Sequence, residues 1–525
     1  MLYLVLLLIY NIKQILSNDI LITKNFKSYK KNSLFFENSK VNEYLDIPYA
    51  QAPINELRFL PPKPLTKGYS FPNKPSFLCP QISNNNWETV KGENISSNKI
   101  PENCLVLNIW QPKITNGGVL VILHSESFPF ASQSVKLLNG SYFAYKTGSI
   151  VVTVSYRVGV LGFARLYNDK LLSGNIGLLD QQLAFKWIYI NIENFNGDTN
   201  KITLFGEGVG AILASSHLYS KESSRYFERI ILFHDHTSIL TNMINSKKLE
   251  MNTAALLEYL KCSNKYYKDY LTCLQKVKIS KIFQSVEKIK KKFNYMLTNP
   301  FVISQEDNLF FKQKIENKIM NDAYKKDVDI FIGSLTNNNF TFIVNQFLDY
   351  GCYYNAMLSN VHCLFNEEQS FYIFKKVIHK MLRMIKYKEQ LKYYIKMKFE
   401  DKIRMLVSKY FSNYTFLNFI KTFSSFFKGK LYSSSTENKL PFQEYPYQNE
   451  ITGDELLKYI FGFYFNNQGD SVDKTIKHRQ KLSSKIMLLL SQFIVNGNVN
   501  KTNINNALTT NEKINPKGIV IKNFL

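Results

Sequence analysis

The chain has 525 residues, 45% of them hydrophobic, which is enough for one large α/β domain or for roughly two to four average domains. Its formal net charge of +25 has two interpretations: a Lys-rich composition that decorates the surface, or attraction to acidic partners such as sulfated glycans and anionic membranes. The sequence contains no nucleic-acid recognition motif, which argues against nucleic acid as a partner.

The first seventeen residues are predicted to be a secretory signal peptide. Residues 1–10 are almost wholly apolar, a length that suits the core of such a peptide and is too short to cross a membrane. The basic residues that usually precede this core are missing. We expect cleavage near Ser17, a single domain over residues 18–505, a tail over residues 506–525, and a secreted, extracellular product without a later membrane anchor.

Strand-like and helix-like segments then alternate along the chain. Several of the strand-like runs are continuous stretches of β-branched and other apolar residues, which is typical of strands buried on both faces. The strands are expected at residues 105–110, 119–123, 150–156, 202–205, 229–233 and 330–332, and the helices at 178–190, 209–219 and 251–260. This alternation predicts an α/β fold with a large, mostly parallel central sheet flanked by helices.

The second half of the chain has three unusual stretches. Residues 371–410 carry twelve Lys or Arg against three acids, with apolar residues at helical spacing. They form either amphipathic helices with a solvated basic face or a surface for an acidic glycan or a membrane. Residues 431–451, rich in Ser and containing Pro441 and Pro446, are predicted to be a loop, and the Asn-rich residues 496–515 a mobile tail.

Cysteines and glycosylation sequons fit a secreted chain. The six cysteines fall as three successive pairs, and an even number in such a chain favours disulfides. These pairs are Cys79 with Cys104, Cys262 with Cys273, and Cys352 with Cys363. Asn-x-Ser/Thr sequons would be usable in the secretory pathway. The glycosylation candidates are Asn94, Asn139, Asn339, Asn413 and Asn500.

The most informative segment is residues 201–210, Lys-Ile-Thr-Leu-Phe-Gly-Glu-Gly-Val-Gly. It reads as a short apolar strand and a glycine-rich turn, and residues 211–219 continue as a helix. In the nucleophile elbow G-x-S-x-G, the middle serine sits on such a strand-to-helix turn with its oxygen exposed. The middle residue here is Gly208, so the turn lacks the reactive oxygen.

Other segments resemble the type-B carboxylesterase and cholinesterase family, and they do so in the family's order. They include Asp46-Ile-Pro-Tyr-Ala-Gln-Ala-Pro, Glu102-Asn-Cys-Leu-Val-Leu-Asn-Ile-Trp, Gly174-Asn-Ile-Gly-Leu-Leu-Asp-Gln-Gln and, late in the chain, Gly453-Asp-Glu-Leu. The resemblance is dense from about residue 45 to 235 and sparser to about 500. It implies the α/β-hydrolase fold.

The resemblance also implies which framework residues pair. Two disulfides match the family, Cys79–Cys104 and Cys262–Cys273, whereas Cys352 and Cys363 match no family bridge and their pairing rests on parity. Two structural ion pairs of the family also match residues of this chain, Arg58 with Glu102 and Arg157 with Asp180.

The catalytic positions of the family are replaced. Acyl transfer needs a nucleophile, a base and an acid that orients the base. The resemblance puts Gly208 at the serine, Asn338 at the acid and Thr452 at the histidine. The glycines that follow the oxyanion-turn histidine, His124 here, are replaced by Ser125, Glu126 and Ser127. We therefore expect no catalytic residue and no esterase activity: a degenerate carboxylesterase.

Three further features have competing interpretations. Trp87 is either a loop residue or the match of the tryptophan that binds the choline ammonium in cholinesterases. Glu207, next to Gly208, would flank what remains of the family's active-site gorge. His234-Asp-His236 lacks further metal donors, so it is interpreted as a loop whose polar side chains are hydrogen-bonded. We expect neither a metal nor a cofactor.

In its loss of the triad residues the chain resembles the cholinesterase-like adhesion molecules, among them the neuroligins. This favours a secreted, catalytically inactive glycoprotein that binds an extracellular protein partner. An acidic glycan bound by residues 371–410 and a homodimer are further expectations. The alternatives are a protein that sequesters esters, amines or lipids, and an active carboxylic ester hydrolase with relocated residues.

Overall fold

The fold is defined by a computed structural model. It describes residues 20–22, 28–30, 32–36, 39–67, 69–70, 77–82, 86–88, 94–96, 100–124, 135–166, 172–233, 246–262, 269–293, 299–335, 428–436, 453–466, 474–499, 511–514 and 518–522.

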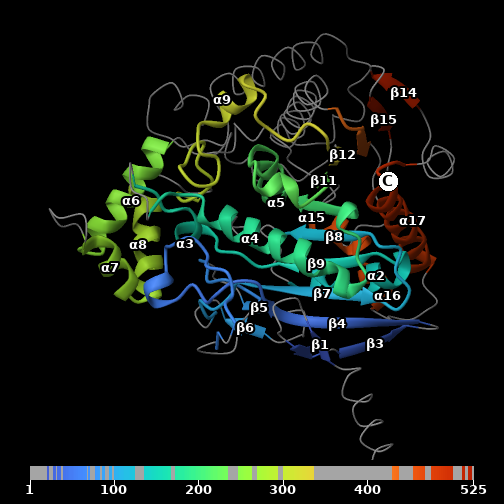
Figure 1. Cartoon of the computed structure of the whole chain (residues 1–525), viewed down its shortest axis with the longest axis horizontal. Coiled ribbons are helices and arrows are strands. Elements are labelled where there is room, and N and C mark those ends of the chain that lie inside the picture. The colour runs from blue at the N-terminus through green and yellow to red at the C-terminus, as the bar shows by residue number, and fades with distance from the viewer. Residues whose placement is uncertain are drawn as a thin grey trace, which may run out of the picture.

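A large mixed sheet organises the molecule (Figure 1). Its described part has eleven strands, in the order β14 (Asn511–Ile514), β15 (Gly518–Lys522), β13 (Leu431–Thr436), β12 (Asp329–Leu335), β11 (Arg229–Phe233), β10 (Ile202–Glu207), β8 (Val119–Leu123), β9 (Ile150–Val154), β7 (Val106–Pro112), β4 (Ser39–Pro48) and β3 (Asn32–Phe36). Neighbouring strands are parallel from β15 across to β9. The remaining pairs at the two sides are antiparallel. The expected α/β fold with a mostly parallel centre is thus confirmed.

Two small hairpin sheets accompany the central one. They pair β1 (Ile20–Ile22) with β2 (Ser28–Lys30), and β5 (Asn86–Glu88) with β6 (Asn94–Ser96). Both are antiparallel.

Helices cover both faces of the sheet because its strands are apolar on both faces. Every residue of β8 and β9 is buried. Successive residues of a strand point to opposite faces, and the two cores separate accordingly. Leu204 belongs to the core with α4 (Ile176–Asn191) and α5 (Val209–Ser216). Phe205 belongs to the core with α2 (Ser141–Thr147), α15 (Gly453–Ile460) and α17 (Lys474–Asn496).

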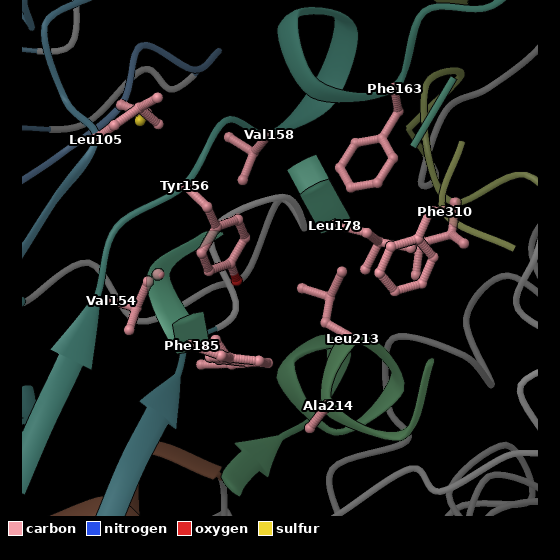
Figure 2. Packing of buried hydrophobic residues seen from close by; sticks show 14 of the residues in the cluster. Leu105, Val154, Tyr156, Val158, Phe163, Leu178, Phe185, Leu213, Ala214 and Phe310 are labelled. Carbon is pink, nitrogen blue, oxygen red and sulfur yellow. The ribbon is translucent and has the colours of Figure 1, made fainter. Parts of the chain in front are cut away.

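Figure 2 shows part of the first core, where Leu178 and Phe185 of α4 lie near Leu213 of α5 and Phe310. The remaining described helices are α3 (Gly159–Phe163), α6 (Ser246–Tyr259), α7 (Asp269–Lys276), α8 (Ile279–Lys292), α9 (Ile315–Met320) and α16 (Phe463–Asn466). Helices α6, α7 and α8 lie at one end of the molecule, on the left in Figure 1. None of the described helices is both long and apolar enough to cross a membrane.

The structure differs from the sequence-based expectation at both sides of the sheet. Leu431–Thr436, predicted as the start of a loop, is strand β13, because pairing with β12 and β15 satisfies its backbone and buries Leu431 and Tyr432. Residues 511–514 and 518–522, predicted as tail, form β14 and β15. Strands β3 and β4 on the opposite side were not predicted at all.

Candidate functional site at the strand-to-helix turn

Residues 207–209 form the sharp turn that the sequence predicts between β10 and α5. Gly208 has φ 56° and ψ −122°, a backbone conformation that glycine reaches readily and that residues with a Cβ atom adopt only under strain. Its N–H donates to Phe233 O at 3.0 Å, and its carbonyl accepts from Ala211 N at 3.0 Å. The elbow geometry is therefore present, and the residue at its apex has no side chain.

The two flanking glycines hold the turn in shape. A Cβ atom on Gly206 would clash with the backbone of Gly210, and one on Gly210 would clash with the carbonyl of Leu123 at the end of β8. Both positions thus need glycine so that α5 can pack directly against the strands. The close packing of the elbow depends on these two residues and not on a side chain at position 208.

An aromatic cluster lies on the α17 side of the sheet, on strands that neighbour the turn. The Phe233 ring, at the end of β11, is 5.8 Å from both the Phe205 and Phe331 rings. Phe205 in turn lies 6.1 Å from Phe461. A Cβ atom on Gly333 would clash with the Phe233 ring, so this ring occupies the space next to Gly333 of β12. These aromatic side chains fix the ends of the strands next to Gly208.

His124 directly follows β8, beside the turn. Its side chain is buried, and its ring centroid lies 5.6 Å from Phe77 and 5.4 Å from Tyr156. The Tyr156 hydroxyl donates a hydrogen bond to the His124 carbonyl oxygen. These contacts hold His124 in place next to the residues that are expected to form the oxyanion turn.

Several predicted residues lie outside the described part of the chain. They are Ser125, Glu126, Ser127, Asn338 and Thr452 of the positions expected to be degenerate, His234-Asp-His236, Cys352, Cys363, the sequons at Asn339, Asn413 and Asn500, residues 1–17 and residues 371–410. Trp87 and Asn94 lie on strands β5 and β6. Asn139 Oδ1 accepts a hydrogen bond from Ser141 N at 2.9 Å.

With the elbow and its surroundings in place, comparison with known proteins gives the family. Residues 30–517 match the carboxylesterase family. The chain belongs to the carboxylesterase family. This match covers most of the chain and includes the elbow, the helices around it and every described strand of the central sheet except β15.

Individual relatives of this carboxylesterase-family chain match over shorter regions. Cholinesterase of Mus musculus is 32% identical over 263 residues, 49% of this chain and 44% of that protein. Acetylcholinesterase 4 of Caenorhabditis briggsae is 32% identical over 311 residues, 58% of this chain and 50% of that protein. Acetylcholinesterase of Gallus gallus is 34% identical over 239 residues, 44% of this chain and 31% of that protein. Each match spans half or less of the relative's length.

The structure of this carboxylesterase-family chain contains both disulfides that the resemblance implied, Cys79–Cys104 and Cys262–Cys273. The second joins the residues just after α6 to α7. Among the described residues, no group of three or more His, Cys, Asp or Glu side chains is arranged to hold a metal ion.

Arg157 and Asp180 form a buried ion pair between the residues after β9 and helix α4. Arg157 Nη2 lies 2.6 Å from Asp180 Oδ1, and both Arg157 Nε and the Arg157 backbone N–H donate to Oδ2, at 2.8 and 3.1 Å. The third nitrogen of the same guanidinium, Arg157 Nη1, donates to Leu60 O at 2.8 Å. Burial raises the pKa of the Asp180 carboxyl, and the guanidinium beside it opposes that rise.

Arg58 and Glu102 form the second pair, which is bidentate with both contacts at 2.6 Å. Arg58 Nη1 also donates to three carbonyl oxygens at the end of α7 and just beyond it, those of Leu274, Gln275 and Val277. One guanidinium therefore links the N-terminal segment to the helix that carries Cys273.

His217, directly after α5, is a buried polar residue that the sequence analysis did not single out. Its Nδ1 lies 2.9 Å from Ser223 Oγ and its Nε2 2.8 Å from Gln181 Oε1 of α4. Phe185 and Phe310 flank the ring at 4.6 and 5.1 Å. Burial lowers the pKa of His217 to about 3, so the ring is neutral at physiological pH. This Ser–His–Gln arrangement is enclosed in the core, where it joins α5 to α4 without access for a substrate.

Proposed function

We propose that the chain is a secreted carboxylesterase-family protein that lacks esterase activity and acts by binding an extracellular protein partner. The observation that carries this proposal is Gly208 at the apex of an otherwise well-formed elbow. Acyl transfer in this fold starts with attack by a side-chain oxygen from that position, and glycine supplies none.

The residues expected at the other catalytic positions support the same conclusion. The resemblance aligns Asn338 and Thr452 with the acid and the base, and neither can orient a base or take a proton from a nucleophile at neutral pH. Ser125, Glu126 and Ser127 replace the glycines whose N–H groups stabilise the oxyanion, and Glu126 adds negative charge there.

Retention of the framework supports a binding role. The two disulfides and the two ion pairs keep a stable surface even though the catalytic groups are replaced. Disulfides also favour an oxidising compartment, in agreement with the apolar N-terminal segment. Fold alone does not carry function, so an esterase framework without its nucleophile can serve recognition through its surface.

The test is ester turnover by the purified secreted protein, measured with a thiocholine ester and a short-chain nitrophenyl ester. A matched sample is treated with an organophosphate that labels activated serines, and a functional cholinesterase serves as the positive control. We expect turnover at the buffer rate and no label, because loss of a triad residue lowers turnover by up to about 10⁶-fold.

Turnover that is abolished by the label would contradict the proposal, because it would require an activated serine outside the elbow. If the esters bind without turnover, sequestration of a small molecule replaces partner binding as the function. Absence of both activities directs the search to partners captured from the extracellular fraction and identified by cross-linking.

A further inference from the structure

Helix α8 and the residues just before it carry an unusual concentration of positive charge. Residues 276–292 contain seven lysines and one acidic residue, Glu287. The inner side of the helix is apolar and buried through Ile282, Val286 and Ile289. The lysines therefore lie towards solvent, at the end of the molecule where α6, α7 and α8 are found (Figure 1).

Four of these lysines form what we call the α8 basic face: Lys281, Lys288, Lys291 and Lys292, all exposed. Lys288 follows Lys281 by two helical turns and Lys292 follows Lys288 by about one, so these three lie in one row along the helix. At about 1.5 Å per residue the row extends about 16 Å. Lys291 lies beside its end.

The positive charge of this face is not neutralised within the described structure. Lys290 pairs with Glu287 at 2.9 Å, but none of the four lysines of the face forms an ion pair with a described residue. Instead, the ammonium groups of Lys288 and Lys292 lie 5.8 and 5.7 Å from the centre of the Tyr259 ring at the end of α6. A cation–π contact holds an ammonium group in place and leaves its charge available, so less conformational entropy is lost when an anion binds.

The pattern suits a linear polyanion better than a lipid surface. Helices that bind membranes place exposed apolar side chains beside their basic residues. On α8 the large apolar side chains are buried or half-buried, and the exposed ones of the described chain lie on other elements, such as Met251 of α6 and Leu488 of α17. Lysines act as point charges without the fixed geometry of arginine, which fits contact with repeated sulfate groups.

We propose that the α8 basic face binds a sulfated polysaccharide. This inference concerns residues away from the elbow and does not depend on the absence of esterase activity. It is also separate from residues 371–410, which remain unchanged in every protein of the test below.

The experiment measures binding of the full secreted chain to size-defined heparin at about 0.15 M salt, a concentration that screens weak surface attraction. One variant replaces Lys281, Lys288, Lys291 and Lys292 by Gln. The matched control replaces four exposed lysines on other elements, Lys63, Lys113, Lys186 and Lys221, by Gln and so loses the same charge. Circular dichroism and thermal unfolding establish that all three proteins are folded alike.

We expect the α8 variant to bind heparin about 30-fold more weakly or worse, because each lysine at an anionic surface contributes up to about fivefold. The control should change by less than about threefold. Equal losses in both variants, or no loss in the α8 variant, would overturn the proposal, since binding would then follow total charge or another region. Binding to phosphatidylserine vesicles without binding to heparin would also overturn it, in favour of a membrane.

Discussion

Gly208 occupies a backbone conformation that any other residue would adopt at a cost. Its φ of 56° lies in the region where a Cβ atom meets the local backbone. Gly206 and Gly210 face a different constraint, because a Cβ atom on either would clash with the backbone of a neighbouring segment. The three glycines of the elbow therefore differ in what a substitution would do.

We predict that Gly208→Ala and Gly208→Ser each lower the free energy of unfolding by about 1–3 kcal/mol, the usual cost of a strained backbone conformation. Gly206→Ala and Gly210→Ala should be more destabilising, since their new methyl groups have no space. Urea unfolding of the four variants provides the ranking. A Gly208→Ala protein as stable as the wild type would mean that the turn relaxes without cost.

Gly208→Ser should also gain no ester turnover, because the expected acid and base remain replaced.

At the scale of elements, ion pairs connect segments that are distant in the sequence. Arg157 and Asp180 connect the residues after β9 to α4, with side chains that are 3% and 0% exposed. The Arg58 and Glu102 side chains are 11% and 17% exposed. Because removal of one partner leaves the other charge uncompensated, the more deeply buried pair should be the more sensitive.

We predict that Asp180→Asn destabilises the protein by about 3–5 kcal/mol, and Glu102→Gln by less. The double variant Arg157→Met/Asp180→Leu should recover part of the loss, because it leaves no unpaired buried charge. Urea unfolding of the single and double variants measures these differences. A loss below about 0.5 kcal/mol for Asp180→Asn would show that the pair does not stabilise the contact between α4 and the residues after β9.

Elements whose sequence is uniformly apolar were predictable, and those whose stability comes from pairing were not. Strands β8 and β11 occur at their predicted bounds because Val119–Leu123 is an apolar run and Arg229–Phe233 is apolar after its first residue. Strand β13 is mostly Ser and Thr, residues typical of loops, and only its neighbours β12 and β15 make it a strand.

The same distinction applies to the candidate site. Gly208 and its flanking glycines were found because the turn is local and its spacing is fixed. The contacts of His217 with Gln181 and the Phe233 ring next to Gly333 join residues far apart in the chain. No local pattern marks such contacts, so only the three-dimensional structure brings them together.

At the scale of the whole molecule, the buried His217 couples stability to pH. The pKa of its ring is about 6.5 in the unfolded chain and about 3 in the folded protein. Between these values the unfolded state binds the extra proton, so stability is fully present above about pH 6.5 and falls as the pH decreases towards 3.

We predict that this one residue costs the folded protein about 2 kcal/mol when the pH is lowered from about 7.5 to about 5. The measurement compares urea unfolding of the wild type and His217→Gln at both pH values. Burial also raises the pKa values of the Asp180 and Asp307 carboxyls. Both residues are the same in the two proteins, so their contributions cancel in the difference. An equal pH dependence in the two proteins would mean that His217 is protonated within the fold or does not limit its acid stability.

The geometry of the elbow also affects which substitutions at position 208 are favoured in evolution. The backbone at position 208 favours glycine, whereas a serine there would carry a strain that only its chemistry could offset. Without that chemistry, glycine is the more stable choice, and a change from glycine to serine meets a stability penalty of about 1–3 kcal/mol. The turn therefore favours one direction of substitution: replacement of a serine by glycine at position 208 relieves strain, and the fold itself opposes the reverse replacement.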